Sequence, residues 1–128
     1  MESQFLPKAP LINHIVGQMI EACELIVSWN DKVTSSDDYL TSPEGKQTMA
    51  ASCMLIESIG EGVKKIDRLT QGLLYEKFPN TQWKEIMGLR DHIAHGYFNI
   101  DSDIIFDVVK TEIPSLQSTL GELKRVIQ

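Results

Sequence analysis

The chain has 128 residues, of which 42% are hydrophobic and 23% charged, close to the averages of globular domains. This composition excludes a disordered or fibrous protein, and the length suits a single folded domain, residues 1–128, with a core of its own. The formal net charge of −6 excludes a generally basic surface for nucleic acid. Any nucleic-acid site on this chain must therefore be a small cationic pocket on an acidic body.

Apolar residues recur every three or four positions over residues 11–30, which predicts a first amphipathic helix. The next stretch, NDKVTSSDDYLTSPEGKQ, is rich in residues that favour turns, so we expect a loop with one short turn near residues 37–40. The Ser-Pro-Glu sequence at 42–44 is favourable at a helix start. A second long helix is predicted to follow, ending at about Leu69.

Two glycines, Gly60 and Gly62, fall inside this second predicted helix. Each costs a helix about 1 kcal/mol relative to alanine. Their presence suggests a structural reason, such as the close approach of another backbone, and simple tolerance is the alternative. The cations Lys64, Lys65 and Arg68 fit a solvated helix terminus, where they interact favourably with the helix dipole.

The segment QGLLYEKFPNTQ, residues 71–82, contains glycine, proline and asparagine and is interpreted as a connector. Thr81 is expected to cap a third helix that begins at Gln82. That helix should stop at Gly96, which can take the left-handed conformation that ends helices at little steric cost.

A fourth helix is predicted to run to the C-terminus, capped by Asp101 or Ser102. Pro114 does not shift its apolar spacing, so we expect a kinked helix with continuous packing. No alternating strand pattern and no repeat is found. The sequence therefore predicts an all-α, up-and-down bundle with four main helices.

The two cysteines, Cys23 and Cys53, lie within apolar helical patterns, where free cysteine behaves as a small hydrophobic residue. We expect both to be reduced core residues, which suits a cytoplasmic protein. The N-terminal segment MESQFLPKAPLINHIVGQ has no basic start followed by a long apolar stretch, and nowhere do about eighteen apolar residues run together. We therefore expect neither a standard export signal nor a membrane span.

The segment GLRDHIAHGYFNID, residues 88–101, gathers the side chains most able to carry chemistry: Arg90, Asp91, His92, His95 and Tyr97. On a continuous helix Arg90 and His95 lie about 140° apart. They would share a face only if the helix end unwinds, and otherwise a second copy of the motif is needed to complete a site.

An arginine and a histidine suffice for RNA cleavage without a metal. The histidine can exchange protons with the ribose and the leaving oxygen, and the arginine can grip two phosphate oxygens. One histidine cannot readily be both base and acid, but two copies across a two-fold axis supply both. Spacing alone favours the structural alternative, in which Arg90 pairs with an acidic neighbour and His95 bonds helix-end carbonyls. With no Gly-rich phosphate loop and no metal-ligand spacing, no cofactor or metal is expected.

This segment resembles the HEPN superfamily, and within it the HepT-like group long labelled DUF86. The HEPN signature is an arginine, a polar residue and then a histidine, here Arg90, Asp91 and His95. The HepT group adds a tyrosine two residues after the histidine, here Tyr97. The stretches IESIGEGVKKI, FPNTQWKEIMGLRDHIAHGYFNID and EIPSLQSTL resemble the group's helices, while the N-terminal 40 residues match only in pattern.

The resemblance implies a HEPN-like bundle of four or five helices that forms a homodimer, with two motifs lining a cleft at the interface. It implies that Arg90 binds the phosphate and the transition state, that His95 is the general acid/base, and that Asp91 orients the pair. His92 has no fixed role in the pattern and either contacts RNA or is simply exposed.

The resemblance further implies a ribonuclease toxin of a type VII toxin–antitoxin pair that cuts or trims tRNA or mRNA. Its antitoxin would be a small nucleotidyltransferase called MNT, which transfers AMP onto Tyr97 and so adds bulk and negative charge beside the arginine. Many members carry asparagine where this chain has Asp91, and a carboxylate there can pair with Arg90 and weaken RNA binding. The alternative function is a non-catalytic subunit that binds the nucleotidyltransferase and helps present its substrate.

Overall fold

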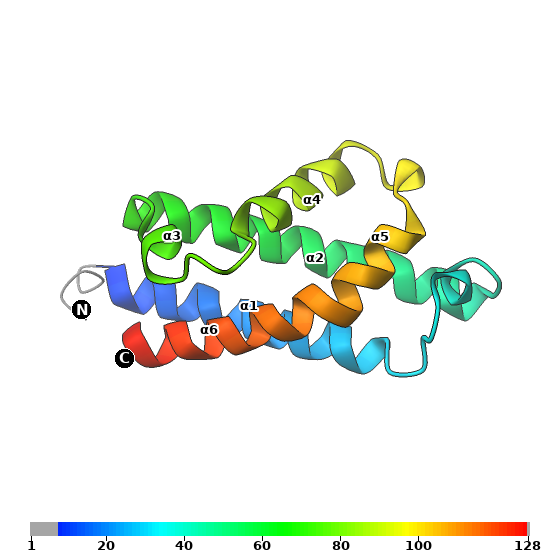
Figure 1. Cartoon of the computed structure of the whole chain (residues 1–128), viewed down its shortest axis with the longest axis horizontal. Coiled ribbons are helices and arrows are strands. Elements are labelled where there is room, and N and C mark those ends of the chain that lie inside the picture. Colours follow the sequence, from blue (N-terminus) through cyan, green and yellow to red (C-terminus); the bar gives the residue numbers. More distant parts are fainter. Residues whose placement is uncertain (1–7, 128) are drawn as a thin grey trace.

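The computed structural model describes residues 8–127, and in this range the chain forms helices and no strand. Residues 1–7, on which the expectation of no export signal partly depends, lie outside it. Four long helices lie side by side and successive ones run in opposite directions (Figure 1): α1 (Ala9–Trp29), α2 (Pro43–Thr70), α4 (Trp83–His95) and α6 (Ile113–Ile127). The predicted all-α, up-and-down bundle is confirmed.

Helix α1 packs one face against α2 and α6. By length and composition alone α1 would also pass as a membrane span. One such helix is weak support for a span, because a core helix meets the same criteria, and α1 buries residues from Ile12 to Ile26. Cys23 on α1 and Cys53 on α2 are free and buried, as predicted. Burial raises the pKa of both thiols to about 12.

Helix α2 begins where the sequence predicts. Ser42 is the N-cap, its side chain accepts a hydrogen bond from the amide of Gly45 at 2.9 Å, and Pro43 occupies the first turn. The loop before it contains one short 3-10 turn, η3 (Ser36–Tyr39). Because α2 packs against both α1 and α4, it is the central helix of the bundle.

The connector between α2 and α4 is more ordered than predicted. Gln71 and Gly72 take left-handed conformations, with φ of 54° and 87°, and so end α2. A short helix, α3 (Leu73–Lys77), then buries Leu73 and Leu74. Helix α3 was not predicted, because its five residues lie in a segment bounded by glycine and proline, which is typical of a loop.

Both ends of α4 differ in detail from the prediction. Gln82 is the N-cap and α4 has no side-chain cap, because the Oγ1 of Thr81 lies 3.3 Å from the Oγ1 of Thr119 instead. Gly96 does end α4, but its φ of 168° is extended rather than left-handed. The short turn η4 (Tyr97–Asn99) follows.

The last helical segment is continuous and bent, as predicted (Figure 1). The side chain of Asp101 caps it by accepting a hydrogen bond from the amide of Asp103 at 2.8 Å. The π-helical turn η5 (Val108–Glu112) joins α5 (Ser102–Asp107) to α6. Pro114 lacks an N–H and its ring crowds the carbonyl four residues earlier. The wider π turn directly before it accommodates both effects.

A buried polar group that the sequence analysis did not predict joins the loop to the bundle. Asn30 donates to Ser52 Oγ at 2.9 Å, and Tyr39 donates its hydroxyl proton to Asn30 Oδ1 at 2.6 Å. Asn30 and Ser52 are at most 1% exposed. Lys110 donates to the carbonyl of Asn30 at 2.8 Å. These bonds fasten η3 and the π turn to the ends of α1 and α2.

Candidate active site

Arg90 lies on α4 where α4 packs closely against Gly60 of α2. A Cβ built on Gly60 would lie 2.3 Å from the Cβ of Arg90 and 3.3 Å from the carbonyl oxygen of Ile86. Real Cβ atoms essentially never come within 3.0 Å of another atom, so only glycine admits α4 here. Gly62 similarly admits Met19 of α1, whose Sδ would lie 2.7 Å from an added Cβ. The predicted close approach of another backbone is confirmed at Gly60, whereas Gly62 meets a side chain, that of Met19.

Four charged side chains from α2 and α4 join around Arg90, and we call them the α2–α4 charge cluster: Glu61, Lys64, Arg90 and Asp91. Nη2 of Arg90 lies 2.5 Å from Oε2 of Glu61, and its Nη1 lies 3.1 Å from Oδ1 of Asp91. Nζ of Lys64 lies 2.6 Å from that same Oδ1. The charges alternate in sign along this chain of contacts, and they sum to zero.

The contacts in the cluster shift the pKa values of Asp91 and Arg90. Hydrogen bonds from Lys64 and then Arg90 lower the pKa of Asp91, and the hydrogen bond to Asp91 raises that of Arg90. Asp91 therefore stays ionised. Lys64 differs from its predicted place at a solvated helix terminus. It lies on the face of α2 that packs against α4, where its Nζ contacts Asp91.

The cluster is partly solvated. The side chains of Arg90, Lys64, Glu61 and Asp91 are 26%, 34%, 44% and 48% exposed, respectively. At such exposure water screens each pair, so the cluster adds little to the free energy of unfolding. Its main effect is on Arg90, because Nη1 and Nη2 both face carboxylates while Nε is buried without a hydrogen-bond partner.

His95 is the last residue of α4 and is exposed. Its Nδ1 donates to the carbonyl oxygen of Asp91 at 2.7 Å. In the neutral ring this bond places the proton on Nδ1 and leaves Nε2 with a free lone pair. Because α4 stays helical through His95, the helix end does not unwind, and Arg90 and His95 face different directions. His92, one turn before it, is also exposed.

Tyr97 and Phe98 follow the motif on η4. Burial raises the pKa of Tyr97, which packs against the edge of the core. Phe98 is 97% exposed, and its ring meets that of Tyr97 edge to face, with centroids 5.8 Å apart. The motif end of the bundle thus carries an uncovered aromatic side chain.

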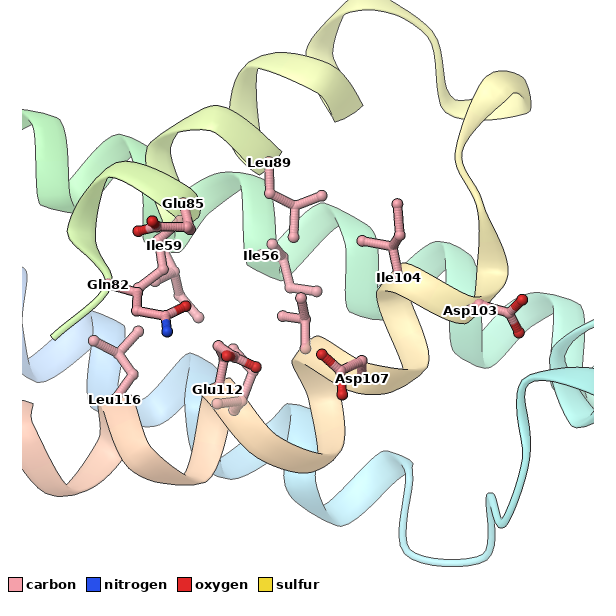
Figure 2. A pocket seen from close by; sticks show the side chains of 13 residues that line it. Ile56, Ile59, Gln82, Glu85, Leu89, Asp103, Ile104, Asp107, Glu112 and Leu116 are labelled. Carbon is pink, nitrogen blue, oxygen red and sulfur yellow. The ribbon is translucent and has the colours of Figure 1, made fainter.

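A groove of about 380 Å³ opens between α2, α4 and the α5–α6 segment. Figure 2 shows Leu89 from α4 and Ile104 from α5 projecting into it. Its floor is aliphatic, and none of its lining residues is basic, whereas four are acidic: Glu85, Asp103, Asp107 and Glu112. These carboxylates repel phosphate, so the lining of the groove does not suit a phosphate ligand.

Of the predicted site residues, the structure brings Arg90 and Asp91 into direct contact and holds His95 by the Asp91 backbone. It leaves His92 in solvent. Glu61 is the charged neighbour that the sequence analysis did not name. Its position beside Gly60 was the available signal, because a glycine that admits a partner helix puts the next residue beside that helix.

An all-α bundle whose third long helix ends in arginine, aspartate, histidine and a following tyrosine defines the HEPN class of proteins. Within that class the chain belongs to the family described as ribonuclease HepT-like, whose model matches residues 19–123.

Individual relatives agree with this family. The chain is 31% identical to "Putative RNase TTE0752" of Caldanaerobacter subterraneus subsp. tengcongensis, over 89% of this chain and 91% of that protein. It is 31% identical to "Probable ribonuclease HepT" of Thermococcus cleftensis, over 82% of this chain and 88% of the relative. It is 33% identical to "Putative RNase MJ1380" of Methanocaldococcus jannaschii, over 73% and 84%. No solved structure gives a significant match.

Proposed function

We propose that this chain is a metal-independent endoribonuclease, the toxin of a type VII HepT/MNT pair, that cuts or trims tRNA or mRNA in the cytoplasm. The observation that carries the proposal is the placement of Arg90 and His95 on α4 of a ribonuclease HepT-like chain. Arg90 is anchored against Gly60, while His95 presents its Nε2 to solvent.

In this mechanism His95 is the general base or acid and Arg90 stabilises charge. Nε2 of one His95 removes the proton of a ribose 2′-OH, whose oxygen attacks the adjacent phosphorus. The bond to the 5′-oxygen breaks, and the second His95 supplies that oxygen with a proton. Arg90 stabilises the negative charge that grows on the phosphate oxygens.

The second histidine comes from a second copy of the chain. Three features support a homodimer around the motif. Arg90 and His95 diverge on α4, Phe98 is almost fully exposed beside them, and the apolar residues Leu89 and Ile104 open to the surface nearby. A two-fold axis at this end of the bundle covers apolar surface and brings two motifs together.

The activity test measures RNA cleavage in EDTA by wild type, His95→Ala and Arg90→Ala. We expect a loss of about 10²-fold or more in each variant. His14→Ala, an exposed histidine on α1, is the matched control and should retain full activity. Equal cleavage by all four proteins would contradict the proposed site.

The dimer test mixes wild type with His95→Ala under conditions that allow subunits to exchange. If one site needs both histidines, activity per total protein falls as the square of the wild-type fraction. A linear fall would show that each copy acts alone.

We further propose that the MNT nucleotidyltransferase inactivates the chain at Tyr97. The Tyr97 oxygen attacks the α-phosphorus of ATP, pyrophosphate leaves, and the tyrosyl proton passes to a base. A base is needed because the raised pKa of Tyr97 keeps its hydroxyl protonated at neutral pH, and in this proposal the partner enzyme supplies that base. Intact mass should rise by one or more AMP units in wild type and stay unchanged in Tyr97→Phe. A full rise in the variant would refute the assignment.

A second candidate function is the non-catalytic subunit that presents substrate to the nucleotidyltransferase. The contact that favours it is the engagement of Arg90 by Glu61 and Asp91, which leaves the cluster without net charge. The EDTA assay separates the two functions, since a non-catalytic subunit leaves RNA intact.

A further inference from the structure

We propose that Glu61 of α2 is a further residue of the active site. Its carboxylate occupies the side of the Arg90 guanidinium that a substrate phosphate takes, so RNA binds only by displacing it. This inference rests on the proposed function for the source of the phosphate, but its chemistry concerns only the anion-binding state of Arg90.

The geometry accounts for every donor nitrogen of Arg90. Nη2 faces Oε2 of Glu61 at 2.5 Å, and Nη1 faces Oδ1 of Asp91 at 3.1 Å. Nε is buried, out of reach of a large anion. Arginine binds carboxylate and phosphate with the same forked geometry. A phosphate that takes the hydrogen bonds that Nη1 and Nη2 now make to Asp91 and Glu61 therefore has to replace a carboxylate.

Glu61 is the carboxylate that can leave. Asp91 is the chain neighbour of Arg90, and Lys64 holds its Oδ1 at 2.6 Å, so it remains close whichever anion binds. Glu61 reaches Arg90 from the other helix, and its side chain is 44% exposed. Rotation about its side-chain bonds takes its carboxylate into water without moving α2 or α4.

The charges of the cluster show why this exchange matters. With Glu61 in place, two cations are matched by two carboxylates, and an approaching phosphate meets no net positive charge. Once Glu61 swings away, Arg90, Lys64 and Asp91 together carry one positive charge. Glu61 therefore weakens the binding of stray anions, and a polyanion with several contacts can displace it.

The test compares Glu61→Gln with the matched control Glu57→Gln. Glutamine keeps the shape of the side chain and one acceptor oxygen but removes the charge. Glu57 lies one turn earlier on α2, and among residues 8–127 no ion pair is found for it. Both variants change the net charge equally, so any difference between them reports the local contact with Arg90.

Binding is measured as fluorescence anisotropy of a labelled 12-mer single-stranded RNA, at fixed salt, in an inactive His95→Ala background. We expect Glu61→Gln to lower the dissociation constant about fivefold and Glu57→Gln to change it by less than about twofold. If Glu61 serves only to position Arg90, its loss would weaken binding. Weaker or unchanged binding in Glu61→Gln overturns the inference.

A second readout needs no RNA and therefore separates this inference from the proposed function. Phenylglyoxal modifies free guanidinium groups, and peptide mass spectrometry follows Arg90 alone. We expect Arg90 to react several times faster in Glu61→Gln than in wild type or Glu57→Gln. If the protein binds no RNA but this acceleration is seen, the proposed function fails, while the inference that Glu61 blocks anion access to Arg90 is supported. If Arg90 reacts at an equal rate in all three proteins, the inference fails.

Discussion

Replacing Gly60 with alanine tests the close approach on which the site is built. The new Cβ would lie 2.3 Å from the Cβ of Arg90 and 2.8 Å from its Cγ. Ordinary van der Waals contact begins at 3.4 Å, so α4 must move by about 1 Å at this point. Such overpacking typically costs about 1–3 kcal/mol, against a gain of about 1 kcal/mol from the better helix propensity of alanine.

Gly88→Ala is the matched control, because Gly88 lies on the same helix α4 with nothing within 4 Å of an added Cβ. The same chemical change there should stabilise the protein by about 0.5–1 kcal/mol. For Gly60→Ala we expect a net loss of up to about 2 kcal/mol and a melting temperature lower by up to about 6 °C.

Thermal and urea unfolding measure the stability of the two variants, and an RNA cleavage assay measures their activity. A shift of about 1 Å in a catalytic group can cost about 10²-fold in rate, so activity should fall in Gly60→Ala well beyond the loss of folded protein. Equal stabilisation by the two alanines would refute the close-approach argument.

Two further predictions concern the core. Tyr39→Phe removes the donor to Asn30 Oδ1 and leaves a buried acceptor unsatisfied, so the free energy of unfolding should drop by about 1–2 kcal/mol in urea titrations; an unchanged midpoint would contradict this. The pKa values of Cys23 and Cys53 are raised to about 12, so above pH 9 the unfolded thiols ionise while the folded ones do not. Stability should therefore fall as the pH rises from 9 towards 12, and the double alanine variant should show a shallower fall than wild type.

The helices could be predicted from the sequence where local signals and burial agree. The cap at Ser42, the buried stripe of α1 and the stop at Gly96 all appear as predicted, because each depends on residues within one or two turns. Helix α3 and the Thr81 contact could not be predicted in this way. Both depend on what the connector meets in space, and Thr81 meets Thr119 from the far end of the chain.

The residues of the candidate site could be proposed from the sequence, but the ion pairs that they form with α2 could not. The residue spacing shows that Arg90 and His95 diverge, and the structure keeps them so on a continuous α4. The structural alternative was also right about the contacts, since Arg90 pairs with acids and His95 bonds a backbone carbonyl. The ion pairs Lys64–Asp91 and Glu61–Arg90 join α2 to α4 across 27 and 29 positions in sequence, and no local pattern reports such a contact.

Lys64 bears on whether Asp91 prevents Arg90 from binding phosphate. Asp91 divides its charge between two cations, whereas Glu61 meets Arg90 alone at the shorter distance. In the proposed site, the principal competitor of a substrate phosphate is therefore Glu61 rather than Asp91.

The central claim is that this bundle cuts RNA with arginine and histidine alone. Its most direct test is to incubate the purified chain with tRNA and mRNA in EDTA and to identify the ends of the products. Attack by a ribose 2′-oxygen predicts 2′,3′-cyclic phosphate and 5′-hydroxyl ends from wild type, and their absence from His95→Ala. Intact RNA with wild type, or the same ends from both proteins, would contradict the account.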